Sequence, residues 1–201
     1  MGALKIYANH VSGNCWKVKW TADYLGVEND WIEVDIFAGA SRTPEFLKLN
    51  PWGQTPTVVL PDGRVLTQSN AIISYLAEGS ALIPADAYAR AQMNEWLFWE
   101  QNSHETTIAT RRAHLNYRGK KESEIDPGML EGGKRALARM EQHLAANDYF
   151  VGDKLTLADI ALVAYTRVAP EGGFDLTPYP SVRKWIARIE RELDIKPIEA
   201  A

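Results

Sequence analysis

The pattern of apolar residues changes once along the chain, near residue 85, and this change limits the possible folds more than any other feature. Before it, short alternating stretches separate segments with helical spacing, which is typical of a mixed sheet flanked by helices. After it, apolar residues recur only at the spacing of long helices. The sequence therefore predicts an α/β domain over residues 1–79, a linker over 80–85 and an all-helical domain over 86–201.

The first domain is expected to have the element order βαβαββα. Short apolar or alternating stretches predict its strands, at residues 4–7, 31–36, 57–60 and 64–67. Helical spacing predicts a helix from Cys15 that is closed by Gly26. Thr43, followed by proline, opens a second helix, and Ser69 is expected to cap a third that runs toward Gly79.

The second domain is expected to consist of helices alone. Helical spacing of apolar residues predicts four of them, at residues 86–115, 128–146, 156–168 and 181–193. A charged break from Gly119 to Pro127 separates the first two. The predicted class is therefore α/β plus all-α.

Charge and cysteine content exclude several classes of protein. The chain has 22 Lys and Arg residues against 26 Asp and Glu residues, with 6 against 8 in residues 1–80 and 16 against 18 in residues 81–201. This balance does not favour nucleic-acid or membrane binding. The single cysteine, Cys15, cannot form an internal disulfide bond, which favours a cytoplasmic location, and we expect no signal peptide or membrane span.

Four short motifs occur in a fixed order along the chain. They are Ser-Gly-Asn-Cys at residues 12–15, Asn-Pro-Trp-Gly-Gln-Thr-Pro at 50–56, Gln-Ser-Asn-Ala-Ile at 68–72, and Thr-Leu-Ala-Asp at 156–159. Together with the predicted elements, they resemble the cytosolic glutathione transferase family. The resemblance covers nearly the whole chain and implies a thioredoxin-like N-terminal domain, a helical C-terminal domain and a homodimer.

Gln68 and Ser69 stand at the predicted start of a helix. The free backbone N–H groups there, the serine hydroxyl and the positive end of the helix dipole can together bind a carboxylate. The resemblance implies that this carboxylate is the γ-glutamyl group of glutathione, with Gln68 as a further polar contact. The alternative is that Ser69 only caps the helix.

Thr55 and Pro56 form the second predicted binding element. The resemblance implies a cis peptide bond between them, and such a turn exposes the backbone of Thr55 to a peptide-like ligand. Gln54 is expected to help hold that ligand. Taken by itself, the motif would be read as an ordinary loop with a trans proline.

The loop before the first helix carries the predicted chemistry. A thiol is a nucleophile only as the thiolate, so the protein must supply a donor that stabilises the sulfur anion of glutathione. Ser12 is the first candidate, since it matches the serine of theta-like and zeta-like members. Asn14 is the second, because some bacterial glutathione-dependent disulfide reductases resemble this loop with asparagine there. The structural alternative is that these residues only form a turn.

Cys15 follows this loop, at the position of the second cysteine of a Cys-x-x-Cys pair, whose first position is taken here by Ser12. Cys15 lies on the apolar stripe of the first helix, so we expect a buried structural thiol. Any redox chemistry would then have to use the sulfur of glutathione.

Weaker candidates lie in the helical domain. Glu100 and His104 are i,i+4 neighbours that continue an apolar stripe, and they form either part of a cleft or a satisfied polar pair within a helix interface. The aromatic residues Trp96, Phe98 and Trp99 are read first as core, with a substrate wall or a dimer surface as alternatives. No histidine has the spacing of a metal ligand, so no metal is expected.

These expectations define one main function and two alternatives. The main one is a glutathione transferase in which glutathione is the co-substrate and residues 86–201 supply the pocket for a small hydrophobic electrophile. The second is a glutathione-dependent disulfide reductase that relies on Asn14. The third is a non-catalytic regulatory or binding protein with the same fold.

Overall fold

The computed structural model describes residues 3–196, and the chain divides into two compact units after Ser80. Each unit has its own apolar core. The assignment of residues 80–85 as a linker stays a prediction.

Unit 1 has the predicted order of strands and helices. Its elements are β1 (Leu4–Ala8), α1 (Gly13–Tyr24), β2 (Asn29–Glu33), α2 (Pro44–Leu49), β3 (Thr57–Val59), β4 (Val65–Thr67) and α3 (Ser69–Leu76), with a short 3-10 turn at Ala40–Arg42 before α2. Gly26 follows α1 with a φ of 67°, and Thr43 caps α2 by accepting the N–H of Phe46, as predicted.

The second strand ends earlier than the predicted residue 36. After Glu33 and Val34 the chain turns away, because the Asp35 carboxylate accepts the backbone N–H groups of Phe37 and Ala38. Such a turn around an aspartate competes with strand pairing. The alternation of apolar residues therefore extends beyond Glu33, although the strand itself ends there.

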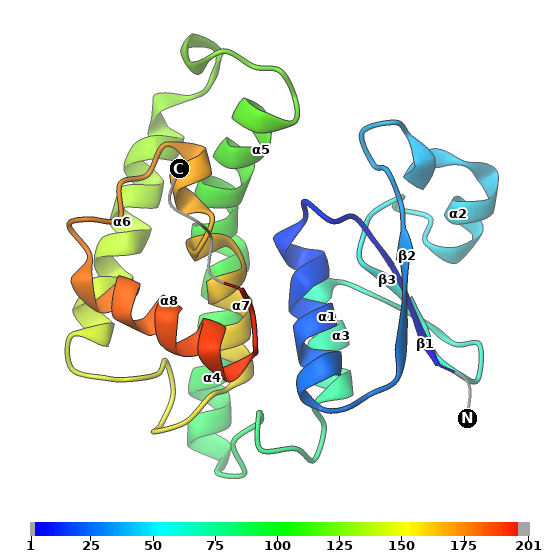
Figure 1. Cartoon of the computed structure of the whole chain (residues 1–201), viewed down its shortest axis with the longest axis horizontal. Coiled ribbons are helices and arrows are strands. Elements are labelled where there is room, and N and C mark those ends of the chain that lie inside the picture. The colour runs from blue at the N-terminus through cyan, green and yellow to red at the C-terminus, as the bar shows by residue number, and fades with distance from the viewer. Residues whose placement is uncertain (1–2, 197–201) are drawn as a thin grey trace. The chain divides into compact units, whose positions relative to one another are not determined.

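The four strands form one mixed sheet in the order β2-β1-β3-β4. Strands β1 and β2 are parallel, with Ile6 opposite Trp31, whereas β3 is antiparallel to both β1 and β4. Helices α1 and α3 pack together on one face of the sheet, and α2 lies on the other (Figure 1). The loops that follow β1 and β2 leave the same edge of the sheet, where ligands of α/β folds commonly bind.

Unit 2 is helical. Its main elements are α4 (Ala87–Trp99), a π-helical segment (Glu100–Ala109), α5 (Thr110–Asn116), α6 (Pro127–Leu144), α7 (Leu157–Thr166) and α8 (Pro180–Glu192), and two short 3-10 turns lie at Glu122–Glu124 and Ala169–Gly172. Every residue of α7 is buried, and this helix contacts α4, α8 and the π-helical segment. Helix α7 is therefore the centre of the core of unit 2.

The predicted helix over residues 86–115 is not uniform, because its middle is the π-helical segment Glu100–Ala109. The hydroxyls of Thr106 and Thr107 donate to backbone carbonyls of the preceding turn, and that of Thr110 donates to the carbonyl of Glu105. Such side-chain bonds to helical carbonyls compete with regular helix bonding. Residues 87–116 are therefore helical throughout, and only the π-helical bonding of the middle segment differs from a regular α-helix.

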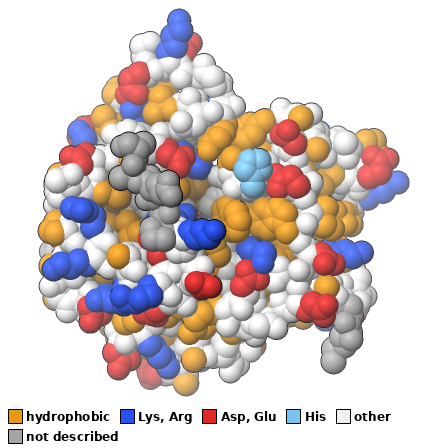
Figure 2. Space-filling model, viewed as in Figure 1, with side chains coloured by type: hydrophobic (Ala, Val, Ile, Leu, Met, Phe, Trp, Pro, Cys, Tyr) orange, Lys and Arg blue, Asp and Glu red, His pale blue; other side chains and the backbone are white. Residues whose placement is uncertain are grey.

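The surface carries charges of both signs. Figure 2 shows acidic and basic side chains interspersed over the face in view. Between residues 3 and 196, no helix has the length and apolar character needed to span a membrane.

Candidate functional site in unit 1

Ser12 lies at the beginning of α1, at the sheet edge where β1 ends. It is half-buried and has an extended backbone, with φ of −88° and ψ of 115°. Its carbonyl accepts the N–H groups of Cys15 and Trp16 at 3.1 and 3.2 Å. Ser12 therefore occupies the cap position of α1, next to the positive end of the helix dipole.

Cys15 is fully buried, as expected for a structural thiol. Burial raises the pKa of its thiol, although the backbone N–H of Asn9 and the side chains of Ser12 and Thr55 form hydrogen bonds with the sulfur. The Cys15 side chain is thus neutral near pH 7. Since Ser12 and Thr55 contact the same sulfur atom, two of the predicted site segments meet here.

The segment 50–56 forms a turn that is held by Asn50. The buried Asn50 amide donates to the carbonyl of Gln54 at 2.9 Å and to the hydroxyl of Thr57 at 3.1 Å, and its oxygen accepts the N–H of Trp52. Gln54 is exposed, Thr55 is half-buried, and Pro56 is buried.

Two unusual features of the backbone shape this turn. The peptide bond between Thr55 and Pro56 is cis, as predicted. Gly53 has a φ of 59°, and a Cβ there would lie 2.8 Å from the carbonyl oxygen of Ser41, so the turn requires glycine at this position.

Gln68 and Ser69 lie at the start of α3, but the predicted cap is displaced by one residue. Gln68 takes the cap position with a φ of 70°, and Ser69 is the first helical residue. Glutamine is not a preferred cap and rarely has a positive φ, so the sequence favoured the serine. Gln68 is exposed, whereas Ser69 is buried.

A hydrogen bond joins α3 to α1 at this point. The hydroxyl of Ser69 donates to the amide oxygen of Asn14 at 3.0 Å, across 55 residues of sequence. Asn14 is in the first turn of α1, two residues after Ser12. The predicted residues of the three segments of unit 1 therefore lie in one connected group.

The weaker candidates of unit 2 fall mostly in its core. Glu100 and His104 are both fully buried in the π-helical segment. The Nε2 atom of His104 lies 2.9 Å from the Thr166 hydroxyl, and Gln101 donates to Glu100 at 2.8 Å. These contacts agree with the interpretation of Glu100 and His104 as buried polar residues of a helix interface.

The aromatic residues at the end of α4 have different environments. Trp96 packs against Trp99 and Phe150, with ring centroids 5.2 and 4.6 Å apart, and Arg139 lies over both tryptophan rings. Phe98, in contrast, is 69% exposed, so its assignment to the core was wrong. In the described part of the chain, no group of three or more His, Cys, Asp or Glu side chains could hold a metal ion.

Two residues near Ser12 were not singled out by the sequence patterns. The sequence patterns predict no role for Asn9, and they place Glu33 only within the predicted strand at residues 31–36. In the structure both contact the loop that carries Ser12. No local pattern signals this role, because Asn9 and Glu33 are 24 residues apart.

Comparison with known proteins agrees with this arrangement. Residues 11–78 match the family described as glutathione S-transferase, N-terminal domain, and residues 105–192 match glutathione S-transferase, C-terminal domain. Glutathione S-transferase 3 of Zea mays is 34% identical over 197 residues, covering 92% of this chain and 88% of the relative.

Solved bacterial structures are also similar. The crystal structure of a glutathione S-transferase from Pseudomonas fluorescens is 42% identical, with a TM-score of 0.90 over 94% of this chain and 95% of that chain. A possible glutathione S-transferase from Rhodopseudomonas palustris is 40% identical, with a TM-score of 0.91 over 98% of this chain and 100% of that chain.

Proposed function

Because the chain belongs to the glutathione S-transferase family, we propose that it is an enzyme that joins the thiol of glutathione to a small hydrophobic electrophile. One observation carries this proposal: residues of the three predicted segments are linked through the contacts of Cys15 with Ser12 and Thr55 and the hydrogen bond from Ser69 to Asn14. Glutathione is the co-substrate, and no metal takes part. The helical residues 86–201 supply the electrophile pocket.

In this proposal each segment binds one part of glutathione. The γ-glutamyl carboxylate lies at the N-terminus of α3, where it accepts hydrogen bonds from backbone N–H groups and Ser69, with Gln68 alongside. The backbone of Thr55 pairs with the peptide backbone of glutathione, and Gln54 supports it. This places the sulfur at the N-terminus of α1.

Ser12 then stabilises the thiolate. A thiol with a pKa of about 8.5 is mostly protonated at neutral pH, so lowering the pKa by each unit requires about 1.4 kcal/mol of preferential stabilisation of the anion. One hydrogen bond from a hydroxyl to an anion supplies this amount. The proton leaves to solvent, a sulfur lone pair forms the bond to the electrophilic carbon, and the leaving group departs with its bonding pair.

The contact between Asn14 and Ser69 bears on the choice of the sulfur donor. Asn14 accepts the Ser69 hydroxyl through its amide oxygen, so this bond orients Asn14 toward the expected glutamyl site but does not use its NH2 group, the part that could donate to sulfur. Asn14 also lies in the first turn of α1, and this position keeps the disulfide reductase as the second candidate function.

Calorimetric titration with glutathione and with oxidised glutathione tests the proposal. We expect reduced glutathione to bind and an aryl halide to be turned over in its presence. Turnover of disulfides alone, abolished by Asn14→Ala, would instead support the reductase. If neither form of glutathione binds, both enzymatic functions are excluded and the non-catalytic alternative is left.

Replacing Ser69 with alanine should weaken glutathione binding more than it slows the reaction. The hydroxyl meets a carboxylate far from sulfur, so it contributes equally to the ground state and the transition state. Because this hydroxyl already bonds to Asn14 in the free protein, the loss should be near the lower limit for a charge-assisted bond, about 1.5 kcal/mol, or a roughly tenfold rise in KM for glutathione. Steady-state kinetics check this, and a large fall in kcat at constant KM would contradict it.

We further propose that two copies of the chain form a homodimer. Trp52, Tyr88 and Phe98 are 72%, 73% and 69% exposed, which is unusual for large apolar side chains. Within unit 2, a hollow of about 400 Å³ lies between the π-helical segment and α6, where a partner can pack. Analytical ultracentrifugation at micromolar concentration should give about twice the 22.5 kDa mass of one chain. A single species of one chain's mass would contradict the dimer.

A further inference from the structure

The loop between β1 and α1 is held by Asn9, the residue that follows the last position of β1. Asn9 is 2% exposed. Its side-chain amide donates to the carbonyl of Val34 and to the carboxylate of Glu33, both at 3.1 Å, and its oxygen accepts the N–H of Val11. Its own backbone N–H donates to the sulfur of Cys15 at 3.3 Å. Asn9 therefore ties the loop to the chain that leaves β2 and to the first turn of α1.

Ser12 is connected directly to this arrangement. Its backbone N–H donates to the carbonyl of Asn9 at 3.0 Å. The indole of Trp16, one turn into α1, donates to the carbonyl of His10 at 2.7 Å. The segment that precedes Ser12 is thus hydrogen-bonded both to the end of β2 and to α1.

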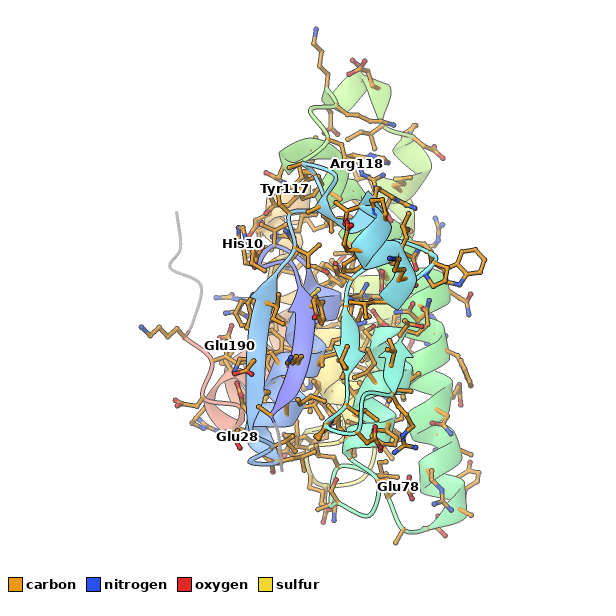
Figure 3. All side chains as sticks on the ribbon, turned by 90° about the vertical axis from the view of Figure 1, so that its right-hand side faces the viewer. His10, Glu28, Glu78, Tyr117, Arg118 and Glu190 are labelled. Atoms are coloured by element: carbon orange, nitrogen blue, oxygen red, sulfur yellow. The ribbon has the colours of Figure 1, made fainter. Side chains whose placement is uncertain are left out.

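Glu33, the last residue of β2, is the second anchor. Besides Asn9, its carboxylate accepts the backbone N–H of His10 at 3.1 Å, the Nδ1–H of His10 at 2.8 Å and the indole N–H of Trp31 at 2.8 Å. Burial alone would raise the pKa of Glu33, but the hydrogen bonds from Trp31 and His10 outweigh it and lower that pKa. Figure 3 shows His10 at the end of the sheet opposite to Glu28, which precedes β2.

We propose that Asn9 and Glu33 are positioning residues that hold the Ser12 hydroxyl where it stabilises the thiolate of glutathione. This inference rests on the proposed function. A donor that stabilises an anion must be held close to the place where the charge develops, and a short loop without such anchors would sample other conformations. In the free protein the Ser12 side chain bonds to the sulfur of Cys15, so a fixed backbone is what keeps its hydroxyl within reach of glutathione. In this proposal Asn9 and Glu33 act through Ser12 and do not contact the sulfur of glutathione.

Asn50 offers a matched control for Asn9. It is also a buried asparagine in unit 1, it also bonds to its loop through both side-chain atoms, and its loop carries the predicted backbone contact to glutathione. The two asparagines should therefore differ in what they affect. Asn9→Ala should act on the thiolate, and Asn50→Ala on the affinity for glutathione.

The test is the ultraviolet absorbance of the thiolate in the glutathione complex, followed against pH. We expect Asn9→Ala to raise the pKa of the bound thiol by about one unit, which lowers the thiolate fraction about tenfold at a pH well below that pKa. Asn50→Ala should raise the Kd for glutathione and shift the thiol pKa much less. In the Ser12→Ala background, Asn9→Ala should add no further shift, since it acts through Ser12.

Glu33→Gln is a second variant at a partly exposed position, and it keeps the size of the side chain. Removal of a negative charge alone would lower the pKa of a nearby thiol, whereas loss of the anchor raises it. We expect a rise, so a fall would overturn the proposal.

Two further outcomes would overturn the positioning role while leaving the proposed function intact. One is an equal pKa shift in Asn9→Ala and Asn50→Ala, and the other is additive shifts in the double variant with Ser12→Ala. A wild-type protein that binds no glutathione, or a Ser12→Ala variant with an unchanged thiol pKa, would instead refute the proposed chemistry itself and the positioning role with it.

Discussion

Replacing Ser12 with alanine is expected to raise the pKa of enzyme-bound glutathione by about one to two units, the equivalent of the 1.5–3 kcal/mol of a hydrogen bond to an anion. Below the thiol pKa, the thiolate fraction falls tenfold for each unit of this rise. If the variant returns to the free value of about 8.5, conjugation at pH 7 should slow by about eightfold to twenty-fivefold, because the wild-type thiol is then already partly ionised. At a pH above the raised pKa, the rates of the variant and the wild type should converge.

The pH–rate profile and the thiolate absorbance of the complex measure this effect independently. Cys15→Ala is the control, because Cys15 is buried beside Ser12 and its loss should cost mainly stability through a small cavity. Asn14→Ala tests the rival donor. An unchanged thiol titration in Ser12→Ala, with a large shift in Asn14→Ala, would transfer the role to Asn14.

The second large effect is expected on the stability of the protein, when Asp159 at the start of α7 is replaced. Asp159 is fully buried, and its carboxylate accepts four hydrogen bonds: the backbone N–H of Phe150, the backbone N–H and hydroxyl of Thr156, and the indole N–H of Trp185, at 2.9 to 3.1 Å. Burial raises the pKa of this carboxyl, and the bonds from Trp185, Phe150 and Thr156 counteract that rise. Thr156 and Asp159 thus form a capping box at the start of α7.

Asp159→Ala should lower the free energy of unfolding by about 3 kcal/mol or more, because each buried donor left without a partner costs about 1–3 kcal/mol. Denaturant unfolding followed by tryptophan fluorescence measures this loss. Asp175→Ala is the matched control in the same unit: Asp175 is exposed and accepts the N–H of Thr177, so its loss should be far smaller. Equal losses in the two variants would contradict the role given to Asp159.

Most of the fold was predictable because its signals are local. The alternation of apolar residues in β1, the glycine after α1 and the capping box of α7 each depend on residues within a few positions of one another. The π-helical segment was not predictable, since the spacing of apolar residues does not distinguish a π-helix from an α-helix over two turns. The exposure of Phe98 was also missed, because an aromatic residue in an apolar helix is usually core.

The sequence by itself determined the order of the elements, the family, and the three segments in which the candidate site residues lie. It could do so because the chemical role of residues such as Ser12, Thr55-Pro56 and Ser69 can be inferred from their local backbone preferences. Only the tertiary structure decided how these segments meet: the bond from Ser69 to Asn14 spans 55 residues and that from Asn9 to Glu33 spans 24. Such contacts arise from packing α1 against α3 and from pairing β1 with β2, and no periodicity in one segment contains information about the other.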